Sequence, residues 1–130
     1  DIFVAPVHTV PSKTLVQAMS YELPIITTDV WSSSELIDDG RTGLLIHHPT
    51  AHMFTDGSIV HFDSHEYRTV LSSKNNEMAK ALVEKIGLLI NNPDLRSKMG
   101  RAARWEVENG RFSTQQRNKD LKKVLDEATA

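Results

Sequence analysis

Strand-like runs separated by a helical segment are the feature of this chain that most restricts its fold. Ile2–Ala5 and Ile25–Thr28 are short runs rich in β-branched and aromatic side chains, and residues 13–22 between them carry apolar side chains at helical spacing. A third run, Leu44–Ile46, follows a glycine turn. Strands joined through a helix run parallel, and runs this apolar are typical of a sheet covered on both faces. The sequence therefore predicts an α/β fold in which a short parallel sheet has flanking helices.

Capping residues and helix breakers set the expected ends of the helices around this sheet. Ser12 can cap the first helix, and Pro24 separates that helix from the next strand. Ser32 with Glu35 three positions later is a capping-box pattern, which predicts a short helix through residue 37.

The rest of the chain divides into an irregular segment and a helical C-terminus. Residues 47–75 are rich in histidine, aspartate and serine, and we expect an irregular insertion there. Apolar stripes predict helices that start near Asn76, Pro93 and Ser113. The length suits a single domain over residues 1–130.

The composition excludes several classes of protein. With 130 residues and a formal net charge of −2, the chain lacks the basic surplus of a nucleic-acid binder, so no nucleic-acid partner is expected. It contains no cysteine, which excludes disulfides and cysteine-ligated zinc. No apolar run is long enough to cross a bilayer. Because the chain begins at Asp1, directly before a strand, we expect it to be a fragment of a longer protein.

A group of histidines in the middle of the chain raises the question of a metal site. They are His47, His48, His52, His61 and His65. Adjacent histidines in an extended segment point to opposite sides, so His47 and His48 do not converge on one ion. We therefore expect no native metal site.

The start of the first helix is the best local candidate for anion binding. A helix N-terminus presents unpaired N–H groups at the positive end of the helix dipole, and Lys13 adds charge between Ser12 and Thr14. An ordinary capped helix with a solvated lysine would give the same pattern. His8, in the preceding loop, can hydrogen-bond a sugar or phosphate or donate a proton, or it can be a plain loop residue.

Several short segments, taken in their order and spacing, carry a family resemblance. They are Asp1–Pro6, Gln17–Ser20, Leu23–Ile26, Glu35–Ile37, Gly40–Leu45, Asn92–Gly100 and Phe112–Ser113. Together they resemble glycosyltransferase family 4, whose members are retaining enzymes with two Rossmann-like domains. The resemblance covers most of the chain outside residues 47–75.

The resemblance implies a partial Rossmann-like sheet from the C-terminal, donor-binding half of a GT-B glycosyltransferase. Such an enzyme transfers a hexosyl unit with retention from a nucleotide-diphosphate sugar, its donor substrate, to a carbohydrate or lipid-linked acceptor. The family uses no metal or other cofactor. The resemblance also implies a cytoplasmic protein, either free or held at the cytoplasmic face of the membrane. The isolated fragment is expected to be inactive.

Both glutamates that the family places near its donor are replaced in this chain. When the family motif is aligned on Ala18–Met19, Thr9 takes the place of the first glutamate, which the family has near the transferred sugar. Gln17 takes the place of the second glutamate, which the family has at the nucleotide ribose. Gln17 can still hydrogen-bond a ribose hydroxyl, without charge assistance, or it can be a plain helix residue. Glu22 and Trp31 stand at positions where the family often has glycine.

The resemblance thus implies a donor site at the carboxyl ends of the strands, where α/β sheets bind ligands. The expected substrate-binding residues are His8, Thr9, Ser12, Lys13, Thr14, Gln17 and Glu35, and no catalytic residue is assigned. Glu35 serves first as a helix cap, with a second role near the donor sugar. Because the two glutamates are replaced, a non-catalytic sugar-nucleotide-binding or scaffold relative remains an alternative interpretation. So does a different Rossmann-like module, such as an epimerase piece or a regulatory domain.

An incomplete sheet also predicts self-association, because open edges and uncovered apolar faces attract partners. We expect a homodimer through Ile2–Val4 or through the helix face around Leu15 and Met19.

Overall fold

A short parallel sheet forms the centre of the protein. The computed structural model describes residues 1–8, 11–51 and 64–129. Its strands β1 (Phe3–Ala5), β2 (Ile25–Thr28) and β3 (Gly43–Ile46) are all parallel and lie in the order β1-β2-β3. The predicted α/β fold with a parallel Rossmann-like sheet is confirmed, with strand ends within one residue of the expected ones.

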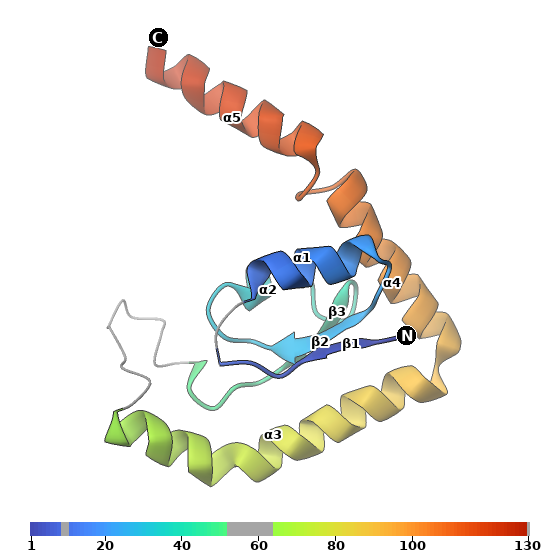
Figure 1. Cartoon of the computed structure of the whole chain (residues 1–130), viewed down its shortest axis with the longest axis vertical. Coiled ribbons are helices and arrows are strands. Elements are labelled where there is room, and N and C mark those ends of the chain that lie inside the picture. The colour runs from blue at the N-terminus through green and yellow to red at the C-terminus, as the bar shows by residue number, and fades with distance from the viewer. Residues whose placement is uncertain (9–10, 52–63, 130) are drawn as a thin grey trace.

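Helices cover both faces of this sheet, as Figure 1 shows. The short helices α1 (Ser12–Ser20) and α2 (Ser33–Leu36) lie on one face, and the long helix α3 (His65–Asn91) runs across the other. Helix α4 (Pro93–Glu108) packs beside β3, and α5 (Thr114–Thr129) extends away from the sheet. The C-terminal part of the chain is therefore helical, as predicted.

Two hydrophobic cores lie back to back across the sheet. Ile25 and Ile26 are neighbours in β2, so their side chains point to opposite faces, and both are fully buried. The core under α1 contains Leu15, Ala18, Met19, Ile25, Ile37 and Ala103. The core under α3 contains Ile26, Leu44, Ile46, Leu89 and Met99. Burial on both faces explains why the strands are apolar.

Helix α4 joins the two cores, since Met99 belongs to one and Ala103 to the other. Between them, Gly100 lies against the turn that ends α1. A Cβ atom on residue 100 would be 2.2 Å from the carbonyl oxygen of Glu22, so only glycine permits this approach.

The turn after α1 has the hydrogen bonds of a Schellman motif. The N–H of Glu22 donates to the carbonyl of Met19 at 3.0 Å, and the N–H of Leu23 donates to the carbonyl of Ala18 at 3.2 Å. Glu22 has a φ of 60°, and Trp31, in the loop after β2, has a φ of 51°. Both replacements of an expected glycine therefore stand at left-handed positions, which glycine occupies with least strain.

The predicted side-chain caps of α1 and α2 do not form. Ser12 is the first residue of α1, and the N-cap position belongs to Pro11, which makes no side-chain cap bond. Ser32 is the N-cap of α2 but has a ψ of 16°, outside the extended conformation that lets a serine oxygen reach the next turn. The capping-box interpretation of Ser32 and Glu35 is therefore wrong.

Helix α3 starts at His65 and not near Asn76, so residues 65–75 are helical and do not belong to an irregular insertion. Ser64 provides the cap: its backbone is extended and its side-chain oxygen accepts from the N–H of Tyr67 at 3.2 Å. Residues 52–63 of the expected insertion lie outside the described residues.

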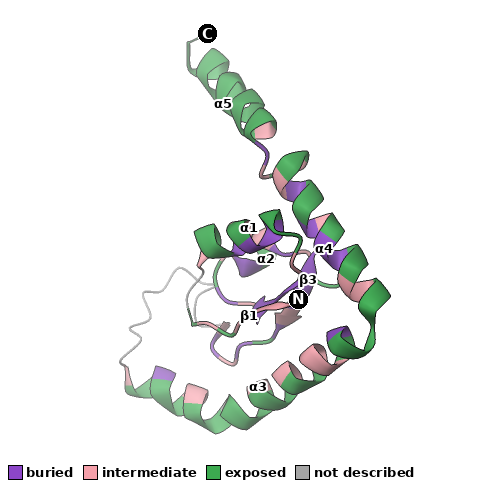
Figure 2. Cartoon of the chain, turned by 45° about the vertical axis from the view of Figure 1, so that its right-hand side comes forward, coloured by how far each residue is buried: buried purple, intermediate pink, exposed green. Residues whose placement is uncertain are grey.

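Exposure corrects one of the expected dimer surfaces. Leu15 and Met19 are fully buried inside the protein, so their helix face is not available to a second copy. Val4 on β1 is 38% exposed, and the sheet edge formed by β1 remains a predicted contact. Figure 2 shows α5 exposed along its length. Among the helices of the described residues, none is both long and apolar enough to cross a membrane.

Candidate functional site

Polar side chains gather where the three parallel strands end, because the chain turns out of the sheet at the same edge each time. Two fully buried threonines of β2 hold the segment that leaves β1. The hydroxyl of Thr27 donates to the carbonyl of Ala5 at 2.9 Å, and the hydroxyl of Thr28 donates to the carbonyl of Val7. These bonds fix the backbone directly before His8. We call the region made up of His8, Asp29 and residues 47–50 the carboxyl edge.

Asp29 joins the end of β2 to the segment after β3. One oxygen of its carboxylate accepts from the backbone N–H of His48 at 2.6 Å. The other lies 2.9 Å from Nδ1 of His47. Because a single carboxylate holds both residues, the backbone after β3 is fixed in place at the carboxyl edge.

His48 is the buried centre of this edge. Its side chain is fully buried, and its Nδ1 lies 2.7 Å from the hydroxyl oxygen and 3.3 Å from the backbone nitrogen of Thr50. Its Nε2 lies 2.8 Å from Nδ1 of His8. Burial lowers the pKa of His48 to about 4, and the neighbouring His8 adds to this shift. His48 is therefore neutral near pH 7.

His8, by contrast, is an exposed residue that two rings hold in position. Its imidazole makes an edge-on contact with His48, with ring centroids 5.1 Å apart, and a second with Tyr67 at 6.4 Å. Tyr67 comes from the first turn of α3 and is buried. A loop histidine is thus fixed by residues 40 or more positions away in the sequence.

The predicted anion-binding residues lie at the start of α1. Ser12, Lys13 and Thr14 form its first turn, are exposed, and have no acidic residue beside them in that turn. The N-terminal N–H groups of the helix and the Lys13 ammonium group therefore offer positive charge that no acid of the same turn opposes. Thr9 lies outside the described residues.

Gln17 and Thr14 line a different surface, the side of α1 next to strand β1. They border a hollow of about 180 Å³ together with Phe3, Ala18, Tyr21 and Leu23. The structure thus groups Thr14 with Gln17, and His8 with the histidines after β3. Whether these residues bind a ligand stays a prediction.

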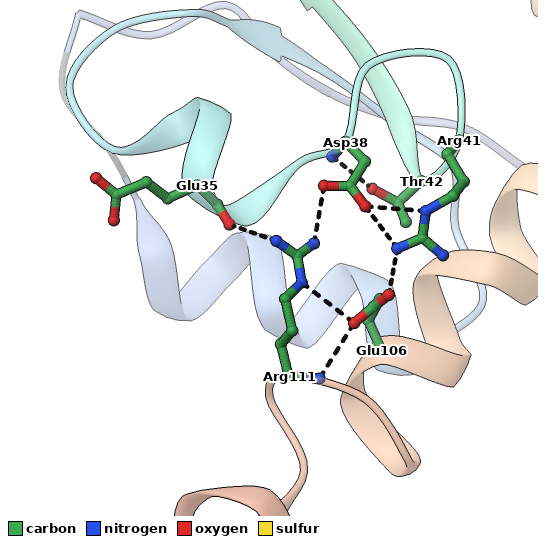
Figure 3. Close-up of polar contacts among 6 residues, drawn as sticks. All are labelled: Glu35, Asp38, Arg41, Thr42, Glu106 and Arg111. Carbon is green, nitrogen blue, oxygen red and sulfur yellow. Dashed lines mark hydrogen bonds and ion pairs between the residues drawn. The ribbon is translucent and has the colours of Figure 1, made fainter. Parts of the chain in front are cut away.

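Glu35 lies on α2, with its side chain exposed. Its backbone carbonyl accepts from the guanidinium of Arg111 at 3.1 Å. This contact belongs to a group of four charged side chains, shown in Figure 3, that sequence reasoning missed: Asp38, Arg41, Glu106 and Arg111.

The two acids and two arginines of this group neutralise one another. Arg41 donates to both Asp38 and Glu106, and Arg111 donates to the same two carboxylates, at 3.0 Å and 3.3 Å respectively. Burial would raise the pKa of Glu106, but the hydrogen bonds and charges of the arginines outweigh it and lower the pKa. The pKa of Asp38 is also lowered, because the effect of Arg41 and Arg111 outweighs that of burial. The group connects the turn before β3 to the end of α4, and its charges are satisfied.

A hollow of about 550 Å³ lies between the segment after β3 and α3. It is bordered by His47, Pro49, Val70, Ser73, Glu77, Met78 and Ala81. Through His47 it adjoins the carboxyl edge. Sequence reasoning did not single out this surface, because it placed residues 65–75 outside any helix.

The described residues hold no group of three or more side chains placed to bind a metal ion. His47 is exposed and His48 is buried, so the two rings lie in different environments. His52 and His61 fall outside the described residues, so the predicted absence of a metal site stays a prediction.

Two comparisons relate this chain to known proteins. Residues 1–60 match the family model described as glycosyl transferases group 1. The chain is 28% identical over 116 residues to the capsular polysaccharide biosynthesis glycosyltransferase CapM of Staphylococcus aureus. That alignment covers 88% of this chain and 23% of the relative. The residues that match the family model include all three strands, α1, α2 and the carboxyl edge. The chain therefore resembles the group 1 glycosyl transferases, as its motifs predicted, and spans about a quarter of the relative's length.

Proposed function

We propose that this chain is part of a glycosyltransferase that takes a hexosyl unit from a nucleoside diphosphate sugar. Transfer proceeds with retention to a carbohydrate or lipid-linked acceptor, and the chain supplies part of the donor side. The carboxyl edge and the first turn of α1 form this donor side. The whole enzyme would be a longer protein of GT-B type, working at the cytoplasmic side and without a bound cofactor.

One observation carries the proposal. The segment that matches the family model ends its three parallel strands at a single edge, and fixed polar groups collect there. The N-terminus of α1, with Lys13 and no acid in its first turn, begins four residues after His8. Parallel α/β sheets bind their ligands outside this edge, and helix N-termini bind phosphates.

The chemistry that these groups can supply is stabilisation of the leaving diphosphate. Negative charge grows on the diphosphate as its bond to the sugar breaks, and fixed N–H donors and a lysine ammonium group lower the energy of that state. The same groups hold the donor in the correct orientation.

A second candidate function is a non-catalytic sugar-nucleotide-binding relative. The residues that favour it are Thr9 and Gln17, which stand where the family has two glutamates. Thr9 cannot supply negative charge beside the reacting sugar, and Gln17 cannot supply it at the ribose. Donor binding without transfer would be the result expected of such a relative.

Both candidate functions require binding of a sugar nucleotide, and a donor titration tests for it. UDP-glucose, GDP-mannose and ADP-glucose are titrated calorimetrically into the longest available form of the protein, as wild type and as Lys13→Ala. We expect Lys13→Ala to weaken binding about fivefold, since an exposed charged contact is worth about 1 kcal/mol.

The matched control is Lys123→Ala, an exposed lysine on α5. Equal affinities of the two variants would remove Lys13 from the site. A transfer assay with and without carbohydrate acceptors then separates the enzyme from the non-catalytic relative.

A further inference from the structure

The buried histidine of the carboxyl edge has no role in the donor contacts described so far, yet all of its polar atoms are engaged. His48 lies between Thr50, on its Nδ1 side, and His8, on its Nε2 side. A buried imidazole with both nitrogens in hydrogen bonds is held in one orientation. This arrangement leads from a buried threonine to an exposed histidine.

The hydrogen bonds fix where the proton of His48 resides. A backbone N–H can only donate, and the N–H of Thr50 points at Nδ1 of His48 with an N···N distance of 3.3 Å. Nδ1 must therefore accept, and in a neutral imidazole the proton then sits on Nε2. Burial keeps His48 neutral by lowering its pKa to about 4, so this form holds near pH 7.

The same reasoning passes to His8. The Nε2–H of His48 donates to Nδ1 of His8 over 2.8 Å, so Nδ1 of His8 accepts. In the neutral form of His8, the proton must then sit on its own Nε2. The ring contacts to His48 and Tyr67 restrict the rotamer, so this N–H has a fixed direction on an exposed side chain.

We propose that Thr50 and His48 are positioning residues that make His8 a fixed Nε2–H donor to an oxygen of the bound sugar nucleotide. This inference rests on the proposed function, and it adds a specific contact at the carboxyl edge. The acceptor is a phosphate oxygen or a sugar hydroxyl, because both accept hydrogen bonds and neither requires a charged imidazole. A donor set in advance loses little entropy when the ligand binds.

Imidazole nitrogen NMR tests the arrangement without any ligand. Long-range proton–nitrogen spectra at pH 7.5 should show His8 and His48 both protonated at Nε2, with Nδ1 unprotonated. In His48→Phe, His8 should lose this preference and populate both neutral forms. His48→Gln should preserve it, because its amide N–H₂ can reach the place of the imidazole Nε2–H. Protonation of His8 at Nδ1 in the wild type would overturn the inference, whatever the protein binds.

Donor affinity tests the consequence. We expect His8→Phe and His48→Phe each to weaken sugar-nucleotide binding about tenfold, the loss of one hydrogen bond of roughly 1.4 kcal/mol. The double variant should be no weaker than His8→Phe alone, since both changes remove one contact. His48→Gln should stay within about threefold of wild type, and His65→Gln, an exposed histidine on α3, is the matched control.

The outcomes separate this inference from the proposed function. If the wild type binds a sugar nucleotide and His48→Phe binds it equally well, the inference fails and the function stands. If no sugar nucleotide binds, the proposed function fails, and with it the role given to His8. If His48→Phe does not fold, His65→Gln is the folded reference, and a large loss of affinity in His48→Gln relative to His65→Gln would overturn the inference.

Discussion

Replacement of Glu22 by glycine is expected to stabilise the protein. Glu22 has a φ of 60° at the C′ position of a Schellman motif, where a Cβ atom crowds the following carbonyl. Relief of that crowding stabilises the folded state by about 1–2 kcal/mol. The greater freedom of glycine in the unfolded chain opposes this and destabilises the folded state by about 0.4–1 kcal/mol. A net gain of about 1 kcal/mol remains from the backbone alone.

The side chain of Glu22 contributes little against this gain. Its carboxylate lies 3.7 Å from Arg104, and both side chains are 40% exposed or more. An exposed pair of this kind contributes about 0.2–0.5 kcal/mol. Glu22→Ala removes the ion pair but keeps the left-handed strain, so it is the correct reference. We expect Glu22→Gly to be more stable than Glu22→Ala by about 1 kcal/mol, with Glu22→Asn between them.

Thermal unfolding followed by circular dichroism at pH 7.5 measures the difference. For a chain of this length, 1 kcal/mol corresponds to roughly 3–5 °C in Tm. The matched control is Lys80, an exposed residue inside α3 with ordinary helical geometry. There glycine should be less stable than alanine by about 1 kcal/mol, the opposite sign. Equal stability of the glycine and alanine variants at residue 22 would refute the argument from strain.

Two further results are expected. Gln17→Glu should tighten sugar-nucleotide binding if Gln17 faces a ribose, because a carboxylate accepts stronger hydrogen bonds than an amide; unchanged or weaker binding in calorimetry would place the ribose elsewhere. Stability should also fall as the pH drops from about 6.5 towards 4. In the folded protein the pKa of His48 is about 4, below its value in the unfolded chain, so the unfolded state takes up a proton first and is favoured. Denaturant unfolding at several pH values should show a smaller loss over this range in His48→Gln than in wild type, and equal slopes would contradict the assignment of the buried neutral histidine.

Local patterns were sufficient to predict the framework of this protein. The apolar runs gave the strands almost to the residue, and the intervening helix required them to be parallel. Family-like motifs in the same stretch pointed to the group 1 glycosyl transferases that the comparisons then found. These features depend on neighbours in the sequence, and sequence patterns describe such neighbours directly.

The ends of helices were predicted less well, because capping depends on backbone angles that residue types alone do not fix. Ser32 has the residue type of a cap and the wrong ψ angle, whereas Ser64 is extended and caps α3. Glu22 adopts a left-handed conformation that its residue type disfavours, and the surrounding packing, including the close approach of Gly100, holds it there.

The candidate site was decided by tertiary structure. The sequence identified His8 as a loop residue of several possible roles, and only the fold brings it to His48 and Tyr67. The arginines and acids around Glu106 likewise meet across more than 60 positions of sequence. Hydrogen bonds between such distant side chains form only when the sheet and helices have set their distance and direction. Sequence periodicity therefore determined which elements form, and packing determined which polar groups meet.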